Sequence, residues 1–423
     1  MPTEQKRKAP AHYRMTGIEN RVVTAILARV RKRRNAAAEQ EGHLRVHSSD
    51  AVAPVKLREA RFSDFDAVRE LKRRWGLRTD SFANWEHLWR NNPALADTSP
   101  ERPIGWVLEA EGQTVGYLGN ISLLYHNGGR KLRAVAGTGF VAAPGYRIAS
   151  FRLLSAFYSQ NSVDLFLATT ATEVSGKMLK LFKVDPLPQR DYETVLFWIL
   201  SPHAFVQSVM KKVELSPVLS RITTPLASLA VRTDKILHRR WARRSSHAFE
   251  INEINVSDIG GAFESLWTEK SKEGPQLLAD RSPAFLRWHF DIPGYHGLTR
   301  ILGCFENGEL LGYAAVRTDT NVANGLRRSV VADMLIRHDN QEVIEALLFR
   351  AYQHSKSIGS HSLEILGFPQ SVRRVCSQWR PYSRKYPICP FYYKAADPVL
   401  HKTLSDGALW FASPFDGDTI LVP

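Results

Sequence analysis

One amphipathic helix is the clearest element in the hydrophobic pattern of the chain. Around residues 344–352, apolar side chains recur at positions i, i+3, i+4, i+7 and i+8, which places them on one face of a helix. An apolar strand and a turn, residues 334–340, precede this helix, and a second apolar strand, residues 362–367, follows it. The pattern therefore predicts a helix packed on a sheet. The members of the stripe are Ile344, Leu347, Leu348, Ala351 and Tyr352.

The same order of patterns occurs earlier in the chain, about 200 positions upstream. In each half, an aromatic segment ends near a proline and is followed by a strand, an acidic glycine turn and a strand that begins near Gly-Tyr. Asn307-Gly308 is a strong two-residue hairpin signal, and Glu111-Gly112 is a weaker one. We therefore predict a duplication. The matching segments are 85–93 with 285–293, 105–117 with 301–313, 132–133 with 326–327, 153–154 with 347–348, and Tyr158 with Tyr352.

The length of the chain also favours two domains. At 423 residues it exceeds the roughly 250–300 residues at which single cores usually stop growing. We predict an α/β (α+β) protein with two tandem domains, each built on a mixed, mainly antiparallel sheet flanked by helices. The predicted boundaries are 1–50 for an N-terminal arm, 51–200 for the first domain, 201–248 for a linker and 249–423 for the second domain.

Positive charge is concentrated outside the two predicted domains. The net charge is +15, and residues 1–50 hold 11 Lys/Arg against 5 Asp/Glu, while residues 201–250 hold 9 against 3. Within the arm, Ile18, Val22, Ile26 and Val30 recur every four residues among arginines. This spacing predicts a basic amphipathic helix over residues 16–34, which either packs on the protein itself or binds an anionic membrane surface. The prolines of the linker predict broken amphipathic helices.

Several classes of protein are disfavoured by what the sequence lacks. No apolar run approaches the roughly 18–20 residues that span a bilayer, and no secretory signal follows the basic start, so we expect a cytoplasmic protein, with peripheral membrane attachment through the arm as an alternative. Three cysteines without Cys-x-x-Cys spacing indicate buried thiols rather than disulfides or zinc. Asp416-Gly417-Asp418 is more typical of a turn than of a metal site, so no metal is expected.

Residues 137–154 carry a resemblance to a known family. In Gly137-Thr138-Gly139-Phe140-Val141-Ala142-Ala143-Pro144-Gly145-Tyr146-Arg147-Ile148-Ala149-Ser150-Phe151-Arg152-Leu153-Leu154, a strand leads into a turn and a helix with a Leu-Leu pair. This stretch resembles the central motif of the GNAT superfamily of acyl-CoA-dependent N-acyltransferases. The second half, in residues 281–288 and 410–418, resembles tandem GNAT-like proteins often associated with bacterial cell-surface polysaccharide synthesis.

The resemblance implies acetyl-CoA or another acyl-CoA as co-substrate, bound at this turn. A turn that opens a helix presents free backbone N–H groups, which bind a diphosphate, and Arg147 adds a cation. Ser150 and Arg152 stand where the family's loop has glycine-type residues. The equivalent turn of the second half carries Asp339 and Glu342, which would repel a diphosphate, so cofactor binding is assigned to the first half. The implied contact residues are Phe140, Val141, Ala142, Arg147, Ile148, Ala149, Ser150 and Arg152.

Two carboxylates are candidates for the catalytic base that an amine nucleophile requires. Asp333 lies within an apolar strand, where burial would raise its pKa, and the family often keeps an acidic residue in this strand. Its alternative is a structural carboxylate paired with arginine or backbone groups. Glu173 follows a strand of the first half, and its alternative is a solvated glutamate at a helix start.

Three functions remain open from the sequence. The first is an acyl-CoA-dependent N-acyltransferase that acts on an amine of a small metabolite or sugar. The second is a Fem-type aminoacyl transferase, whose aminoacyl-tRNA would match the basic arm and linker; nucleic acid is not expected as a partner otherwise. The third is a non-catalytic GNAT-like protein that binds a ligand or another protein.

Overall fold

The computed structural model of the protein describes residues 54–96, 102–243, 247–295, 297–385 and 390–421. The predicted N-terminal arm and its helix over residues 16–34 lie outside these ranges. In the first half the elements are β1 (Lys56–Glu59), α2 (Phe65–Arg74), α3 (Phe82–Arg90), β2 (Gly105–Ala110), β3 (Gln113–Asn127), β4 (Arg130–Ala142), α4 (Phe151–Tyr158), β5 (Leu165–Ala168), α5 (Glu173–Leu179), β6 (Asp185–Pro186) and β7 (Thr194–Ile199).

Two helices then lead into the second half of the chain. They occupy the segment predicted as a basic linker and are α6 (Pro202–Lys212) and α7 (Pro217–Leu237). The remaining elements are β8 (Glu250–Ile254), α8 (Gly261–Lys270), β9 (Leu277–Ala279), α9 (Pro283–Phe290), β10 (Thr299–Glu306), β11 (Glu309–Thr320), β12 (Arg327–Ile336), α10 (Gln341–Ser357), β13 (Ser362–Ile365), α11 (Gln370–Gln378), β14 (Tyr382–Lys385), β15 (Tyr392–Ala395) and α12 (Pro398–Thr403).

The strands form two mixed, mainly antiparallel sheets flanked by helices, which confirms the predicted fold class. Their orders are β1-β2-β3-β4-β5-β15-β6, with β9 paired to β3, and β8-β10-β11-β12-β13-β7-β14. Both hairpin turns fall where the sequence placed them: Glu111 and Gly112 have φ of 51° and 74°, and Asn307 and Gly308 have 51° and 81°. Positive φ at both central residues gives the twist that a tight hairpin needs.

The two halves exchange one strand at corresponding positions of the sheets, and β9 of the second half also pairs with β3 of the first sheet. β7 pairs with β13 and β14 in the second sheet, whereas β15 pairs with β5 and β6 in the first. With this exchange, the two sheets have the same order of corresponding strands. The predicted domain boundaries divide the chain near residue 200, and the two sheets do not follow that division.

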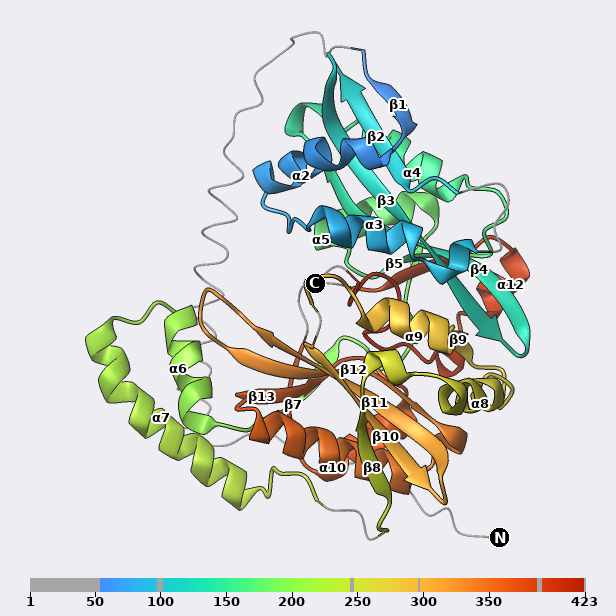
Figure 1. Ribbon diagram of the computed structural model, residues 1–423. Helices are drawn as coiled ribbons and strands as arrows, with labels where there is room; N and C mark the ends of the chain where they lie inside the picture. The colour runs from blue at the N-terminus through green and yellow to red at the C-terminus, as the bar shows by residue number, and fades with distance from the viewer. Residues whose placement is uncertain (1–53, 97–101, 244–246, 296, 386–389, 422–423) are drawn as a thin grey trace, which may run out of the picture.

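The helices and the two sheets lie in layers (Figure 1), and the buried apolar side chains between them form three cores. One core lies between the first sheet and α4, and another lies between the second sheet and α10 with α11. The largest core lies between the sheets and is shared by α2, α3, α8, α9 and the segment after α12. Burial of apolar area in this shared core ties the halves together.

The contact between α3 and α9 is reciprocal. Nε2 of His87 donates to the carbonyl of Trp288 at 2.8 Å, and Nε1 of Trp288 donates to the carbonyl of His87 at 3.0 Å. Their rings stack with centroids 6.4 Å apart. These paired bonds fix α3 against α9 across the core that the two halves share.

Candidate active site

A β-bulge interrupts β4 near the start of the motif that carries the family resemblance. Tyr117 pairs with Val141 and Gly119 with Thr138, so β4 has one residue more than β3 over this stretch. Gly139 at the bulge has φ of 63°. A Cβ on Gly139 would lie 2.6 Å from Cε and 2.8 Å from Nζ of Lys72. The backbone conformation therefore favours glycine here, and a side chain at this position would also displace the end of Lys72.

Beyond the bulge, β4 has only one neighbouring strand. Its parallel pairing with β5 covers Ala134–Ala136 against Leu165–Leu167, and the pairing with β3 continues to Ala142. The C-terminal ends of β4 and β5 thus part from each other. Crevices outside the C-terminal ends of parted parallel strands are the usual ligand sites of α/β proteins.

A small cavity lies beside the bulge, under α2 and α3. Its volume is about 30 Å³, which is room for one or two water molecules. Oδ1 of Asp80 and Nε1 of Trp85 are buried there without a hydrogen-bond partner among the described residues. Buried polar groups normally have a hydrogen-bond partner, so both atoms are available to a molecule in the cavity. The lining residues are Phe65, Val68, Arg69, Lys72, Asp80, Trp85, Leu88, Trp89, Tyr117 and Thr138.

Lys72 and Asp80 are the two charged residues of the cavity lining whose pKa values are shifted by burial. Burial lowers the pKa of Lys72, and the nearby carboxylates of Asp80 and Asp418 oppose that change. Burial raises the pKa of Asp80, against the effect of Lys72. The Lys72 amine also lies over the ring of Tyr117, 5.7 Å from its centroid. Both charged groups are thus moved toward their neutral forms, which is the condition for proton transfer near neutral pH.

The C-terminal segment closes the gap between β4 and β5. Oγ1 of Thr169 and Oγ1 of Thr170, which follow β5, donate to Asp418 at 2.6 Å and 2.9 Å. The amide of Asp418 donates back to Oγ1 of Thr169 at 3.0 Å. Burial raises the pKa of Asp418, and hydrogen bonds from Thr169, Thr138 and Thr170 oppose the rise. A residue near the end of the chain therefore completes the site of the first half.

The predicted cofactor-binding residues lie around the turn that joins β4 to α4. Phe140, Val141 and Ala142 end the strand, and the N–H groups of Ile148 and Ala149 have no acceptor among the described residues. Arg147 and Ile148 are exposed. Free N–H groups next to an exposed arginine at the start of a helix are suited to an anion.

Ser150 and Arg152 are engaged within the protein. The Ser150 hydroxyl donates to the carbonyl of Arg147 at 2.6 Å, and the Ser150 amide donates to Tyr146 at 3.0 Å. The guanidinium of Arg152 donates to the carbonyl of Val55 at 2.6 Å. The free donors of the turn therefore lie in its first segment, residues 147–149.

The corresponding turn of the second half is closed by its own side chains. Oδ1 of Asn340 accepts from the amides of Glu342 and Val343 at 2.9 Å and 3.4 Å. Arg337 is held by Glu269 and Glu309 at 2.7 Å and 2.9 Å. Because these N–H groups are capped and the arginine is paired, this turn has fewer free hydrogen-bond donors and less free positive charge for an anion than residues 147–149 have.

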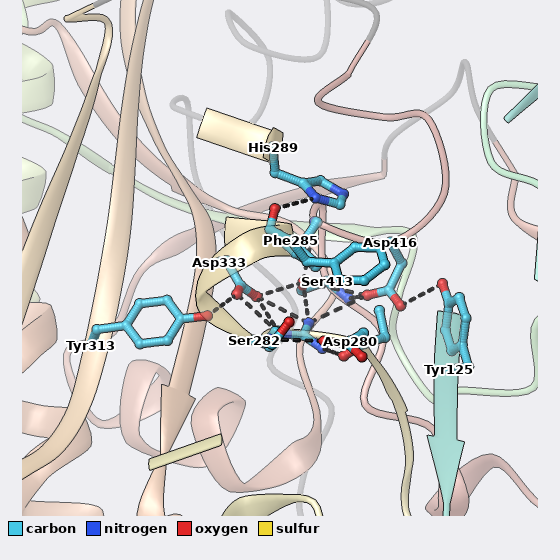
Figure 2. Close-up of polar contacts among 12 residues, drawn as sticks. Tyr125, Asp280, Ser282, Phe285, His289, Tyr313, Asp333, Ser413 and Asp416 are labelled. Carbon is cyan, nitrogen blue, oxygen red and sulfur yellow. Dashed lines mark hydrogen bonds and ion pairs between the residues drawn. The ribbon is translucent and has the colours of Figure 1, made fainter. Parts of the chain in front are cut away.

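Asp333 lies in β12 at the second half's own bulge, where Ala315 pairs with Asp333 and Val316 with Val331. The carboxylate is fully buried against Arg281, whose Nε is 3.0 Å from Oδ2 and 3.2 Å from Oδ1. The hydroxyl of Tyr313 donates to Oδ2 at 2.6 Å and that of Ser413 to Oδ1 at 3.1 Å (Figure 2). The geometry is that of a buried ion pair.

The same network includes Asp416, and His289 lies beside it against Phe415. Asp416 accepts from Tyr125 at 2.9 Å and lies 3.7 Å from Arg281, and burial raises its pKa to about 6 (Figure 2). The ring of His289 stacks on Phe415 with centroids 3.8 Å apart, and burial lowers its pKa to about 3. Among the described residues, no group of three or more His, Cys, Asp or Glu side chains is placed to hold a metal ion.

Glu173 begins α5 after Thr172, whose side chain accepts from the amide of Ser175 and caps the helix. The side chain of Glu173 lies outside the described part of the chain. The structure thus brings together residues that the sequence analysis did not select, namely Lys72, Asp80, Tyr117 and Asp418, around the bulge of a strand that it did select.

Comparison with known proteins shows the fold. No protein-family model matches the sequence, and no curated protein matches it. A GCN5-related N-acetyltransferase from Anabaena variabilis ATCC 29413 matches with a TM-score of 0.52 at 9% identity, over 81% of this chain and 73% of that one. One from Kribbella flavida gives 0.52 at 9%, over 83% and 73%. The N-myristoyltransferase of Saccharomyces cerevisiae, solved with bound myristoyl-CoA, gives 0.50 at 8%, over 82% and 81%. The chain therefore has the fold of the GCN5-related N-acetyltransferases.

Proposed function

We propose that this protein is an acyl-CoA-dependent N-acyltransferase that acylates an amine of a small metabolite or sugar. The observation that carries the proposal is the meeting of two features at one end of β4. A bulge with the half-buried Lys72 and Asp80 beside it lies on one side, and a helix-opening turn with free N–H groups lies on the other. One feature suits acyl transfer, and the other suits the diphosphate of the acyl donor.

The residues around the turn fit a coenzyme A diphosphate in part. The N–H groups of Ile148 and Ala149 and the guanidinium of Arg147 would bind it, whereas Arg152 is already bonded to Val55. Bound acyl-CoA supplies the activated thioester carbonyl. Because β4 runs from the bulge toward the turn, both proposed sites lie along one strand, which supports the proposal.

The chemistry requires one proton transfer and one stabilised oxyanion. The acceptor amine attacks the thioester carbonyl, so a C–N bond forms, the C–S bond breaks, and coenzyme A leaves as its thiolate. Asp80, whose pKa is raised by burial, takes the proton from the attacking amine. The Lys72 ammonium lies against the bulge and stabilises the negative charge that develops on the carbonyl oxygen. The thiolate then takes a proton from water, and Asp80 returns its proton to the hydroxide that forms.

A second candidate is a non-catalytic binding protein. It is favoured by the engaged amide and hydroxyl of Ser150 and by the small volume of the cavity, about 30 Å³. Such a protein would bind coenzyme A or an acceptor without turnover.

Titration calorimetry with acetyl-CoA, a long-chain acyl-CoA and free coenzyme A tests donor binding. An amine panel with detection of released thiol then tests transfer. Asp80→Asn should lower kcat by roughly 10²–10⁴-fold, as expected for loss of a general base, while donor affinity stays unchanged. Asp66→Asn is the matched control, because its carboxylate lies on α2 with 81% of the side chain exposed.

The outcomes separate the candidates. Donor binding with turnover that depends on Asp80 supports the acyltransferase. Donor binding without turnover of any amine supports the binding protein. If the parent protein binds none of the three ligands, the turn at residues 147–149 does not bind coenzyme A, which contradicts both the acyltransferase and the coenzyme A-binding protein.

A further inference from the structure

We propose that the outer face of α7 docks on the surface of an anionic lipid bilayer. This proposal concerns a surface of the linker and does not depend on the proposed enzymatic activity. It rests on the distribution of apolar and polar side chains around α7, which is the reverse of the usual one.

The apolar side chains of α7 point away from the protein. Large aliphatic residues recur along the helix with spacings of three, four and seven, and they are 52–68% exposed. A surface helix normally turns its apolar stripe toward the core. The members of this outer stripe are Val218, Leu219, Ile222, Leu226, Leu229, Ile236 and Leu237.

The inner face of α7 is made of small and polar residues. Thr224 and Ser228 are each 5% exposed, and the Ser228 hydroxyl donates to the carbonyl of Thr224 at 2.6 Å. At 100° per residue, the outer stripe lies opposite these two residues. The helix therefore turns small and polar residues inward and keeps its large apolar side chains on the outside.

The position of α7 leaves this face accessible. Figure 1 shows α7 along the outside of the molecule beside α6, away from the first sheet. Its 21 residues give an outer stripe about 30 Å long. Within the described ranges, no helix combines the length and the apolar character needed to cross a bilayer, so the helix would lie along a surface rather than across it.

The charges around the stripe favour lipid over a second copy of the chain. Arg221 and Arg232 are exposed on one flank, and further exposed cations are Lys211, Lys212, Arg239 and Arg243. The one acidic residue of α7, Asp234, is already paired with Arg240 at 2.8 Å. Two copies of α7 facing each other would bring like charges together without carboxylates to pair them. Anionic headgroups match the cations, and acyl chains match the stripe.

Co-sedimentation with vesicles tests the proposal on the full chain. The parent should bind vesicles of equal parts phosphatidylcholine and phosphatidylglycerol, and bind pure phosphatidylcholine less. Leu226→Gln/Leu229→Gln should weaken binding by roughly tenfold or more, from loss of buried apolar area, and Arg221→Gln/Arg232→Gln by roughly fivefold per arginine, on anionic vesicles alone. Leu181→Gln/Val399→Gln is the matched control, since these side chains are 71% and 73% exposed elsewhere.

Each other outcome overturns the proposal. Parent protein that does not sediment with either vesicle contradicts it, as does unchanged binding of Leu226→Gln/Leu229→Gln. A dimer in analytical ultracentrifugation that this variant converts to a monomer would assign the stripe to self-association. A lowered unfolding temperature of the variant without lipid would show that the chain itself, for instance residues 1–53, covers the stripe.

Discussion

Replacing Arg281 with Leu should destabilise the protein strongly, because Arg281 is the cation between two buried carboxylates. Its Nη2 lies 3.1 Å from Asp333 and 3.7 Å from Asp416, and the guanidinium is fully buried. The two carboxylates raise the pKa of Arg281 against the effect of burial, so the side chain stays charged. Without it, Asp333 and Asp416 must remain desolvated as unpaired anions or take up protons.

The size of the effect follows from the burial of the pair. Removal of one partner of a buried ion pair costs about 3–5 kcal/mol, compared with a total stability of about 5–15 kcal/mol for a typical domain. An unfolding entropy of about 2.1 cal/mol/K per residue, applied to 423 residues that unfold in one transition, gives a fall in Tm of about 3–6 °C.

Differential scanning calorimetry and urea unfolding measure this loss. Arg73→Leu is the control, since Arg73 is 70% exposed in an ion pair with Glu70 on the surface of α2, and its loss should leave the Tm unchanged. The double variant Arg281→Leu/Asp333→Asn should be less destabilised than the sum of its single changes, because the substitutions share one interaction. An Arg281→Leu protein with the Tm of the parent would refute the buried ion pair.

The same experiment separates two roles of Asp333. If Asp333 is a partner of Arg281, Asp333→Asn lowers the Tm, and acyl transfer measured well below that Tm keeps its rate. If Asp333 is the catalytic base, the rate falls by roughly 10²-fold or more and the variant retains the Tm of the parent. The network in Figure 2 favours the first result.

Three further changes test other parts of the structure. Arg147→Ala should weaken coenzyme A binding by roughly tenfold to a hundredfold in titration calorimetry, from loss of one charge-assisted contact, and Arg337→Ala should change it much less. Gly139→Ala should lower the Tm, since its Cβ would lie 2.6 Å from Cε of Lys72 at a φ of 63°. His289 has a pKa of about 3 in the folded protein, compared with the ordinary value of 6.5, and so stays neutral when folded. The free energy of unfolding should therefore fall as the pH drops from 6.5 toward 3. His289→Phe should reduce this pH dependence, measured as urea midpoints across that range.

Local pattern was sufficient for the elements that are set by neighbouring residues. The stripe from Ile344 to Tyr352 predicted α10, and both glycine turns predicted hairpins, because side-chain period and turn conformation are local properties. The sequence Thr194–Ile199 forms β7, but its partners are β13 and β14, more than 160 positions away. A short apolar run predicts a buried strand, but it does not predict which sheet that strand joins.

The candidate site shows the same limit. Lys72 lies among Arg73 and Arg74 in a charged stretch, and Asp418 lies in an Asp-Gly-Asp turn, so neither differs locally from a solvated surface residue. Lys72 and Asp418 belong to the candidate site because other segments bury them. Those contacts join residues that are far apart in the sequence, so local pattern does not predict them. The turn at residues 147–149 was predictable, because free N–H groups at a helix start follow from its strand–turn–helix pattern alone.

The exchange of strands explains how the second half serves a site that lies in the first. β15 fills the position between β5 and β6, and Asp418 then reaches Thr169 at the end of β5. Without β15, β5 would expose one edge of its backbone, and unpaired edges are prone to aggregation. Without the segment after α12, the gap between β4 and β5 would lose Asp418, which contributes to the charge around Lys72. The second half thus supports the site of the first through its terminal strand and segment, although its own turn is closed to anions by Asn340.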